Sequence, residues 1–344
     1  MKKNIIILSL FVLAAIAIFA ADTRVITEPD GTKVTIPVNP QRIACPYHPA
    51  FDKIVMLSQG SRVAFLPMKL SPWSLRLFPD LKKVPTGTPG MTPDPELFLQ
   101  HKIDLIFYPK GRFNAANYAQ LGIPLVCPYN VNYVPKNIEE HTAEFQKQIN
   151  FFADILGGDA KAKADKYNKY LADITNRVKA ITSKIKESNK PRVYYGRATD
   201  LHTTQGHNTV MHWYTEVAGG IYLPKKYKQY FAMVSREDLL ALDPDIIMLG
   251  LSGFEGKPDK APSLDGLRAK TNGKVYNVPF GMFYWEMTSC ETALLPLYLG
   301  KKFHPELFAH WDIIKEMKNF YFEIYGVKIS DKDAERILAS LPPQ

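Results

Sequence analysis

Histidine, arginine and aromatic side chains gather next to several short apolar segments of this chain. Tyr47 and His48 directly follow one such segment, and Tyr195 and Arg197 lie at the end of another. An imidazole nitrogen is a common metal ligand, and a guanidinium binds carboxylates and oxyanions through paired hydrogen bonds. Aromatic rings stack on planar or catecholate groups. These residue types together predict a site for a small anionic or metal-containing molecule.

Each candidate ligand-binding residue has a side chain that can bind metals, anions or planar groups. Each also lies in a loop beside an expected strand or helix. They are Tyr47, His48, Lys110, Arg112, Tyr195, Arg197, His202, His207, Tyr284, Trp285 and Glu286. His48 and His207 are the candidate metal ligands, because one histidine from each half could complete an octahedral metal whose other positions a chelator fills. The competing explanation for the aromatic residues is packing inside the fold.

Motifs of common hydrolases and nucleotide-binding enzymes are absent from the sequence. It contains no HExxH zinc motif, no P-loop and no GxGxxG turn, and residues 250–254 fail the GxSxG pattern at its last position. We therefore expect no enzyme activity and no intrinsic cofactor. Paired catalytic carboxylates need not be local in sequence, so an exported hydrolase on an α/β scaffold is the alternative to a binding protein.

One short phrase occurs in both halves of the chain. Glu96 and Glu237 each begin a short apolar helix, and an aspartate that precedes an apolar strand follows eight residues later. A carboxylate at a helix N-terminus is stabilised by the helix dipole, which is a structural explanation for each glutamate taken alone. The recurrence predicts two similar α/β lobes with a ligand site in the cleft between them.

Short strands alternate with helices in both halves, which is typical of parallel sheets with helices on both faces. Asp30 and Gly31 predict the turn of a β-hairpin that precedes the first lobe. We expect further strands at 42–45, 62–66, 105–108, 124–127, 192–195, 246–249 and 275–278, and helices at 51–57, 97–100, 114–121, 137–156, 209–218, 292–303, 312–325 and 331–339. The Pro- and Gly-rich stretch 67–95 has no expected element before its last residues.

A long amphipathic helix joins the two halves. Apolar residues spaced three and four apart from Ala164 to Ile185 predict a helix over 160–187. The pattern is too short for a coiled coil, so we expect a rigid strut lying across both lobes. The expected divisions are a signal peptide, an N-terminal lobe, the connecting helix and a C-terminal lobe, at 1–21, 22–158, 159–188 and 189–344.

The N-terminus has the three parts of a signal peptide. Lys2 and Lys3 precede an apolar run over 5–19, and Ala20-Ala21 provides the small residues of a cleavage site. The run is short for a comfortable membrane span, although an uncleaved anchor is the alternative. The chain of 344 residues is long enough for two domains, and its 46% hydrophobic content supports real cores.

The net charge bears on possible partners, and the cysteine spacing bears on metal sites and disulfides. The formal net charge of +9 fits a solvated basic surface, and we expect no nucleic acid partner because no recognition motif accompanies it. The three cysteines form no CxxC pair and are most simply buried thiols. In an oxidising compartment Cys45 and Cys127 are the pair that could bridge, since each ends a strand of the first half.

Several segments, in their order and spacing, resemble the periplasmic substrate-binding proteins of ABC importers for iron–siderophore complexes, haem, cobalamin and related metal species. The resemblance covers nearly the whole chain after the signal peptide. Its segments are 30–31 with 36–43, 95–106, 216–220, 234–247, 285–289 and 303–308. Lys102 and Ile103 stand where the family usually has a proline before the aspartate.

The resemblance implies the class III periplasmic-binding fold, with two Rossmann-like lobes and parallel-rich sheets joined by one long rigid α-helix. It implies a periplasmic monomer that captures a ferric siderophore or, next, a nickel complex, with haem, cobalamin and oxyanions such as molybdate also open. The metal would be cargo. The partners would be an inner-membrane permease and its ATPase, with Glu96 and Glu237 docking onto basic pockets of the permease.

Overall fold

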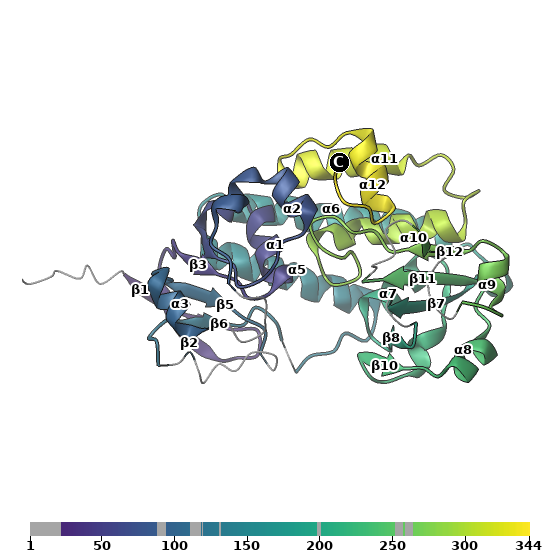
Figure 1. Cartoon of the computed structure of the whole chain (residues 1–344), viewed down its shortest axis with the longest axis horizontal. Helices are drawn as coiled ribbons and strands as arrows, with labels where there is room; N and C mark the ends of the chain where they lie inside the picture. The colour runs from purple at the N-terminus through teal and green to yellow at the C-terminus, as the bar shows by residue number, and fades with distance from the viewer. Residues whose placement is uncertain are drawn as a thin grey trace, which may run out of the picture.

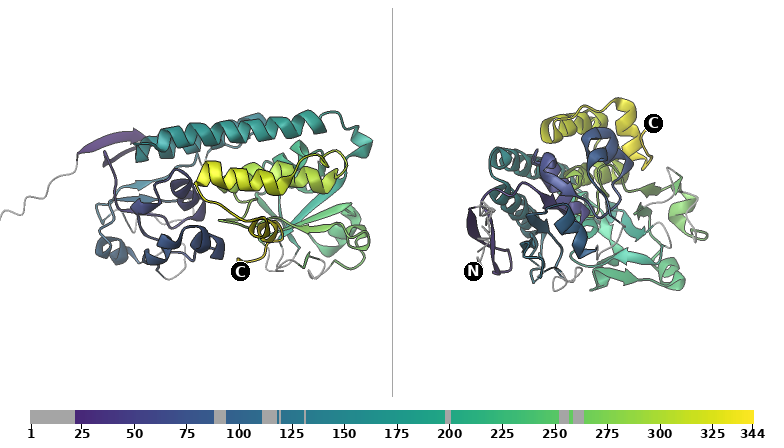
Figure 2. Two further views of the ribbon diagram at one scale, coloured as in Figure 1. Left: turned by 90° about the horizontal axis from the view of Figure 1, so that it is seen from above. Right: turned by 60° about the vertical axis from the view of Figure 1, so that its left-hand side comes forward.

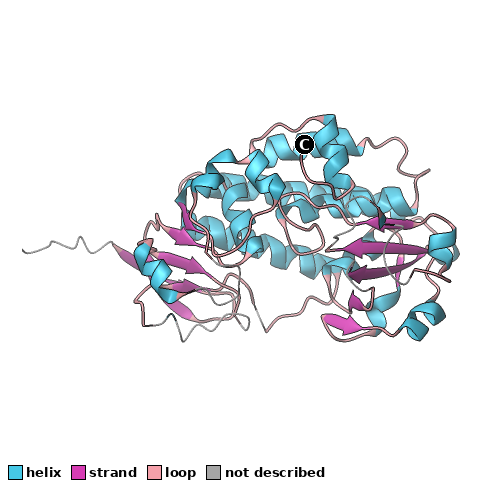
Figure 3. Cartoon of the chain, in the orientation of Figure 1, coloured by secondary structure: helices cyan, strands magenta, loops and turns pink. Residues whose placement is uncertain are grey.

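The computed structural model describes residues 22–87, 94–110, 118, 120–130, 132–197, 201–251, 257–258 and 264–344. The predicted signal peptide over 1–21, the candidate Arg112 and most of the helix expected at 114–121 lie outside these residues. Two separate sheets mark two lobes, and helices surround them (Figure 1, Figure 3). No helix in the described part of the chain combines the length and the hydropathy needed to cross a membrane.

The first lobe is built on a parallel sheet with the strand order β4-β3-β5-β6. These strands are β3 (Ile43–Ala44), β4 (Val63–Phe65), β5 (Leu105–Phe107) and β6 (Leu125–Val126). Most of their residues are buried and apolar, as expected for strands covered on both faces. The predicted hairpin is confirmed as the antiparallel pair β1 (Thr23–Thr27) and β2 (Lys33–Pro37).

The second lobe repeats this plan with the parallel strand order β12-β11-β7-β9. Its strands are β7 (Arg192–Arg197), β9 (Ile221–Tyr222), β11 (Ile246–Gly250) and β12 (Val275–Asn277). A separate antiparallel ribbon of β8 (Thr203–Gln205) and β10 (Phe231–Met233) was not predicted. Its three-residue strands are too short, and β8 too polar, to give a period-2 signal.

The repeated phrase occupies the same place in both lobes, as α3 (Pro95–Gln100) and α8 (Arg236–Leu242). The aspartate that follows each helix fixes the start of the neighbouring strand. Asp104 accepts a hydrogen bond from the backbone N of Arg42 at 3.0 Å, and Asp245 accepts one from the backbone N of Arg192 at 2.8 Å. The predicted α/β fold with two similar lobes is therefore confirmed, and the aspartates of the phrase have a structural role.

Two long helices run along both lobes, α5 (Ile138–Leu156) and α6 (Ala160–Thr182) (Figure 2). The buried face of α6 contains the predicted apolar residues from Ala164 to Val178. The helix ends at Thr182, five residues before the predicted end at 187. At this end the Thr182 hydroxyl donates to the Val217 carbonyl at 2.7 Å. Ile185 lies beyond the helix end and packs over Gly219. Because this residue is apolar and fits the helical spacing, the sequence pattern extended the predicted helix too far.

The other α-helices of the described chain surround the sheets. They are α1 (His48–Met56), α2 (Pro72–Leu77), α7 (Val210–Val217), α9 (Arg268–Thr271), α10 (Leu295–Phe303), α11 (Ile313–Phe320) and α12 (Asp331–Leu338). Helix α2 lies in the stretch for which no element was expected, and the Ser71 side chain caps it. The helix predicted over 312–325 is α11 continued by a π-helical turn at Tyr321–Tyr325.

Buried hydrophobic residues of both lobes belong to one continuous cluster, which reaches from Ile26 in the hairpin to Ile337 in α12. The two lobes are therefore packed against each other at their base as well as connected by α5 and α6. Cys45, Cys127 and Cys290 are free and buried, so the bridge considered for the first two is absent from the structure.

Candidate functional site

The first lobe presents two rings where β3 leads into α1. Tyr47 is the N-cap residue of α1, and its ring meets that of Tyr129 edge-on at 5.5 Å. His48 begins the helix, and its Nε2 donates to the Lys69 carbonyl at 2.8 Å. Burial lowers the pKa of His48, so the ring is neutral at neutral pH.

The His48 ring reaches the second lobe. It stacks on Phe283 with the ring centres 4.7 Å apart and an interplanar angle of 11°. Phe283 in turn contacts Tyr284 at 5.3 Å, and Tyr284 stacks on Phe280 at 4.4 Å. The segment after β12 therefore continues a line of rings that begins in the first lobe, which is the arrangement that could hold a planar or aromatic ligand.

A buried carboxylate lies at the carboxyl end of the second sheet. Glu286 Oε1 accepts hydrogen bonds from the backbone N of Leu251 at 2.7 Å and from the Tyr195 hydroxyl at 3.4 Å. Its Oε2 is buried and has no hydrogen-bond partner among the described residues. Burial raises the pKa of Glu286 to about 7. Gly250 allows this approach, because a Cβ there would collide with Glu286 and Tyr195.

Arg197 is the cation of this region. Its guanidinium lies over the Phe231 ring at 5.5 Å, and its Nε is buried without a hydrogen-bond partner in the described structure. Arg197 pairs in register with Gly250, which Glu286 and Tyr195 approach, so it lies near Glu286. Its positive charge opposes the rise that burial produces in the pKa values of Tyr284 and Glu286. An unpaired guanidinium donor beside aromatic rings suits an anionic ligand.

The structure thus brings together six of the predicted ligand residues, from both lobes: Tyr47, His48, Tyr195, Arg197, Tyr284 and Glu286. Trp285 adjoins them in sequence, but it is fully buried and packs edge-on against Tyr298 at 6.2 Å. Its indole therefore belongs to the core of the second lobe, which is the packing explanation that the sequence left open.

Three other predicted residues are engaged elsewhere. The Lys110 ammonium pairs with Glu28 at 2.5 Å and Asp30 at 2.6 Å, so it ties the hairpin to the first sheet. This pairing raises the pKa of Lys110 and lowers that of Asp30 to about 2. His202 bonds to the backbone carbonyl of Val234, next to the ribbon. His207 is exposed and lies 4.9 Å from the ring of His212 in α7.

The two candidate metal ligands have no neighbour in common among these contacts. His48 contacts Phe283 and Lys69. His207 contacts His212 and Trp213. Across the described residues, no group of three histidine, cysteine, aspartate or glutamate side chains could hold a metal ion.

Two charged residues below the site were missed by the sequence reasoning. Asp52 and Lys53 are completely buried in α1, and the Lys53 ammonium lies over the rings of Tyr129 at 6.0 Å and Phe145 at 4.8 Å. Burial raises the pKa of Asp52 and lowers that of Lys53. The sequence did hold a signal for them, a pair of adjacent charges inside an otherwise apolar helix. Charged residues are rarely buried without a specific partner, so this pair indicated buried bonds.

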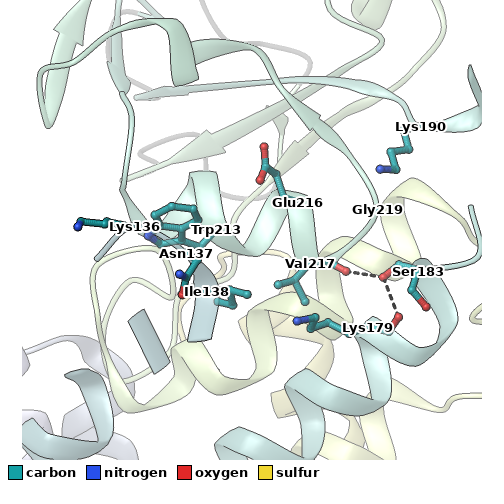
Figure 4. A pocket seen from close by; sticks show the side chains of 11 residues that line it. Lys136, Asn137, Ile138, Lys179, Ser183, Lys190, Trp213, Glu216, Val217 and Gly219 are labelled. Atoms are coloured by element: carbon teal, nitrogen blue, oxygen red, sulfur yellow. Dashed lines mark hydrogen bonds between the residues drawn. The ribbon is translucent and has the colours of Figure 1, made fainter. Parts of the chain in front are cut away.

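A cavity of about 390 Å³ lies away from these residues, between α5, α6 and α7 (Figure 4). None of the predicted ligand residues lines it. Three of its charged side chains already have partners of opposite charge: Lys179 with Glu139, Lys190 with Glu187, and Glu216 with Lys225. We therefore place the candidate site at the interlobe residues rather than in this cavity.

The predicted docking residues lie on the surface of each lobe. Glu96 is exposed in α3 and Glu237 is exposed in α8. Both follow a capped helix start, where the side chain of Asp94 or Ser235 accepts a backbone hydrogen bond.

Comparison with known proteins gives one family and a consistent fold. The profile of a family described as periplasmic binding protein matches residues 77–280. A search of curated proteins found no match. Among solved structures, the chain is similar to a periplasmic solute binding protein from Veillonella parvula, with 22% identity, a TM-score of 0.71, and coverage of 92% of this chain and 97% of the other.

Two further structures have 19% identity to this chain. The molybdate periplasmic binding protein of Haemophilus influenzae, solved with molybdate bound, has a TM-score of 0.75 over 89% of this chain and 99% of its own. A Helicobacter pylori protein solved as a nickel–histidine complex has a TM-score of 0.70 over 92% and 99%. At these identities the structural likeness establishes the fold.

Proposed function

Because the chain belongs to the family of periplasmic binding proteins, we propose that it is the solute-binding component of an ABC importer, with an anionic metal chelate as its cargo. Two observations carry the choice of cargo: the line of rings across the lobes, and a buried guanidinium nitrogen without a hydrogen-bond partner in the described structure. His48 stacks on Phe283, and Arg197 pairs in register with Gly250, which Glu286 approaches. Rings can stack on a chelator, while the guanidinium binds its negative charge.

We propose roles for individual residues on this basis. Tyr47 and His48 form the first-lobe wall, and Tyr284 forms the second-lobe wall. Arg197 binds the negative charge, and Tyr195 orients Glu286 beneath it through the 3.4 Å hydrogen bond. A ferric siderophore is the first choice of cargo and a nickel chelate the second, because both combine a metal with a chelator that offers carboxylate or ring groups.

We propose further that residues 1–21 direct export and are removed, and that Glu96 and Glu237 dock the loaded protein onto its permease. The two exposed carboxylates, one on each lobe, support a partner with two matching basic surfaces. N-terminal sequencing of the protein from a periplasmic extract tests the first point: a mature chain that begins at Ala21 or Asp22 supports export, and an intact Met1 contradicts cleavage.

The cargo is tested on protein purified from the periplasm. Native mass spectrometry should show a mass increment that contains a metal, and calorimetry of the stripped protein should show one-to-one binding of one probe among a ferric tris-catecholate, nickel with histidine, and molybdate. If no probe binds and the protein is purified free of any metal or small molecule, the proposed cargo is wrong. Turnover of an ester or glycoside panel would instead support the hydrolase alternative.

A further inference from the structure

A segment of the second lobe, residues 281–290, is held at its beginning by hydroxyl groups of the first lobe. The Ser71 hydroxyl donates to the Gly281 carbonyl at 3.0 Å, and the Ser74 hydroxyl donates to the Met282 carbonyl at 3.2 Å. Both serines are buried at the start of α2. The backbone of this segment is therefore bonded across the lobe boundary as well as packed against it.

The end of the segment is held by charged residues of α1. Asp52 accepts a hydrogen bond from the backbone N of Cys290 at 2.5 Å, and the Lys53 ammonium donates to the Thr288 carbonyl at 3.1 Å. The other carboxylate oxygen of Asp52 accepts from the Tyr325 hydroxyl at 2.6 Å. Both oxygens of a first-lobe carboxylate are thus bonded to atoms of the second lobe.

The same segment is also bonded to its own lobe. Glu291 accepts from the backbone N of Phe283 at 3.1 Å and from the Tyr321 hydroxyl. The Gln205 side-chain amide donates to the Glu286 carbonyl at 3.1 Å. Residues 281–290 therefore connect the two lobes, with bonds to each, rather than forming a loop that is free at its tip.

Moving the lobes apart would break these bonds together. Each buried carbonyl, amide and charge left without its partner carries a desolvation cost, and this cost is largest for charged groups. Because both charges on α1 are fully buried, a small opening cannot exchange their partners for water one at a time. The contacts should therefore resist any gradual change in the spacing of the lobes.

We propose that residues 281–290 are an interlobe clip that adds to α5 and α6 in holding the lobes at one spacing, and that Asp52, Lys53, Ser71 and Ser74 are its fastening residues. The clip also carries Phe283 and Tyr284, so its fastening residues position these rings. That positioning role rests on the proposed function, whereas the fixed spacing is a property of the ligand-free chain and is measured without ligand.

The test uses the ligand-free full-length protein and a double variant, Ser71→Ala with Ser74→Ala. This variant removes both interlobe bonds, the bond between the two hydroxyls and the Ser71 cap of α2, and it introduces no buried charge. Ser340→Ala is the matched control, because it removes a buried hydroxyl that donates to a carbonyl, that of Val278, within the second lobe. Hydrogen exchange is measured over residues 281–290. Spin labels at Gln100→Cys and Asn272→Cys, on exposed positions of opposite lobes, report the interlobe distance.

We expect exchange over 281–290 to accelerate by about ten-fold in the double variant, with a broader distance distribution, while the control behaves as the parent. Asp52→Asn should change both measurements further, and if it fails to fold, the serine variant alone decides. Unchanged exchange and an unchanged distance distribution in the serine variant would overturn the clip. Ligand binding is read separately, so failure of the cargo proposal leaves this result interpretable.

Discussion

The two lobes agree in their scaffold and differ in what they bring to the candidate site. Asp104 and Asp245 bond the start of the neighbouring strand in the same way. Among the described residues of the site, however, the first lobe contributes neutral rings, whereas the second contributes the charged or acidic groups of Arg197 and Glu286. A repeated framework therefore supplies the geometry, and we infer that the second lobe chooses the charge of the ligand.

The repeated phrase contains buried positions, which pack inside each lobe, and exposed positions, which do not. Phe98 and Leu239 are buried at matching positions. Glu96 and Glu237 are exposed, and so is a leucine three residues after each. Single exposed leucines need no explanation, but recurrence on the same face as the glutamate in both lobes favours a shared external partner.

The largest effect is expected from reversing the charge of both glutamates that we propose dock onto the permease. If the permease presents basic pockets there, the combined substitution Glu96→Lys and Glu237→Lys places ammonium groups against them, and like charges at an interface cost several kcal/mol. We expect transport by vesicles that contain the permease and ATPase to fall by about 100-fold or more. Cargo affinity should stay unchanged, because neither residue lies near the ligand-site rings.

The single reversals sharpen the comparison of the lobes. If the lobes dock as equals, Glu96→Lys and Glu237→Lys should reduce transport by similar factors. A large loss for one and none for the other would show that the repeat is structural in one lobe. The combined substitution Glu306→Lys and Glu335→Lys, at exposed positions outside the phrase, is the control for general charge effects.

The next largest effect concerns the division of charge between the lobes. Arg197→Ala should weaken binding of an anionic chelate by about 10- to 100-fold, since a charge-assisted hydrogen bond contributes roughly 1.5–3 kcal/mol. His48→Ala should weaken it less, because this ring stacks and is neutral. Calorimetry with the probe that the parent binds measures both. Equal losses, or a stronger effect of the first-lobe ring, would contradict the inference that the second lobe selects charge.

The sequence predicted the lobes better than the site because periodicity reports burial and not contacts across the chain. The apolar runs of β5 and β11 and the stripe of α6 reflect burial within one element, so they were visible. The pairing of Lys110 with Glu28 joins residues far apart in sequence, and no local pattern records it. The same holds for Asp52, whose partners Cys290 and Tyr325 come from the other end of the chain.

A third prediction uses the buried acids of the second lobe. Burial raises the pKa of Glu286 to about 7 and of Glu291 to about 8, from an ordinary value of 4.5. The folded chain therefore binds these protons more tightly than the unfolded chain. The stabilisation is complete below pH 4.5 and is lost as the pH rises through about 7 and about 8.

We expect the free energy of unfolding to fall between about pH 5 and 8, by up to roughly 1.4 kcal/mol per pH unit for each carboxyl. Urea denaturation at several pH values measures it. Glu291→Gln should flatten the slope, and Glu335→Gln, an exposed position, should not. A slope that persists unchanged in Glu291→Gln would show that another group carries the dependence.

The smallest expected effect tests whether the leucines of the repeated phrase belong to the docking surface. Leu99 is 53% exposed and Leu240 is 39% exposed, and Leu307, which lies outside the phrase, is also 39% exposed and serves as the matched control. Substituting each by serine should change the free energy of unfolding by less than about 0.5 kcal/mol, because surface changes away from specific contacts are nearly neutral.

Affinity for the detergent-solubilised permease should fall by about three- to ten-fold for Leu99→Ser and for Leu240→Ser, since covering even part of a leucine contributes about 1 kcal/mol. Leu307→Ser should bind as the parent does. If all three variants behave alike, the recurrence of the leucine reflects helix composition, and only the glutamates of the phrase face the partner. If the two phrase leucines alone weaken binding, and by similar factors, the partner contacts both lobes through the same acidic and apolar pair.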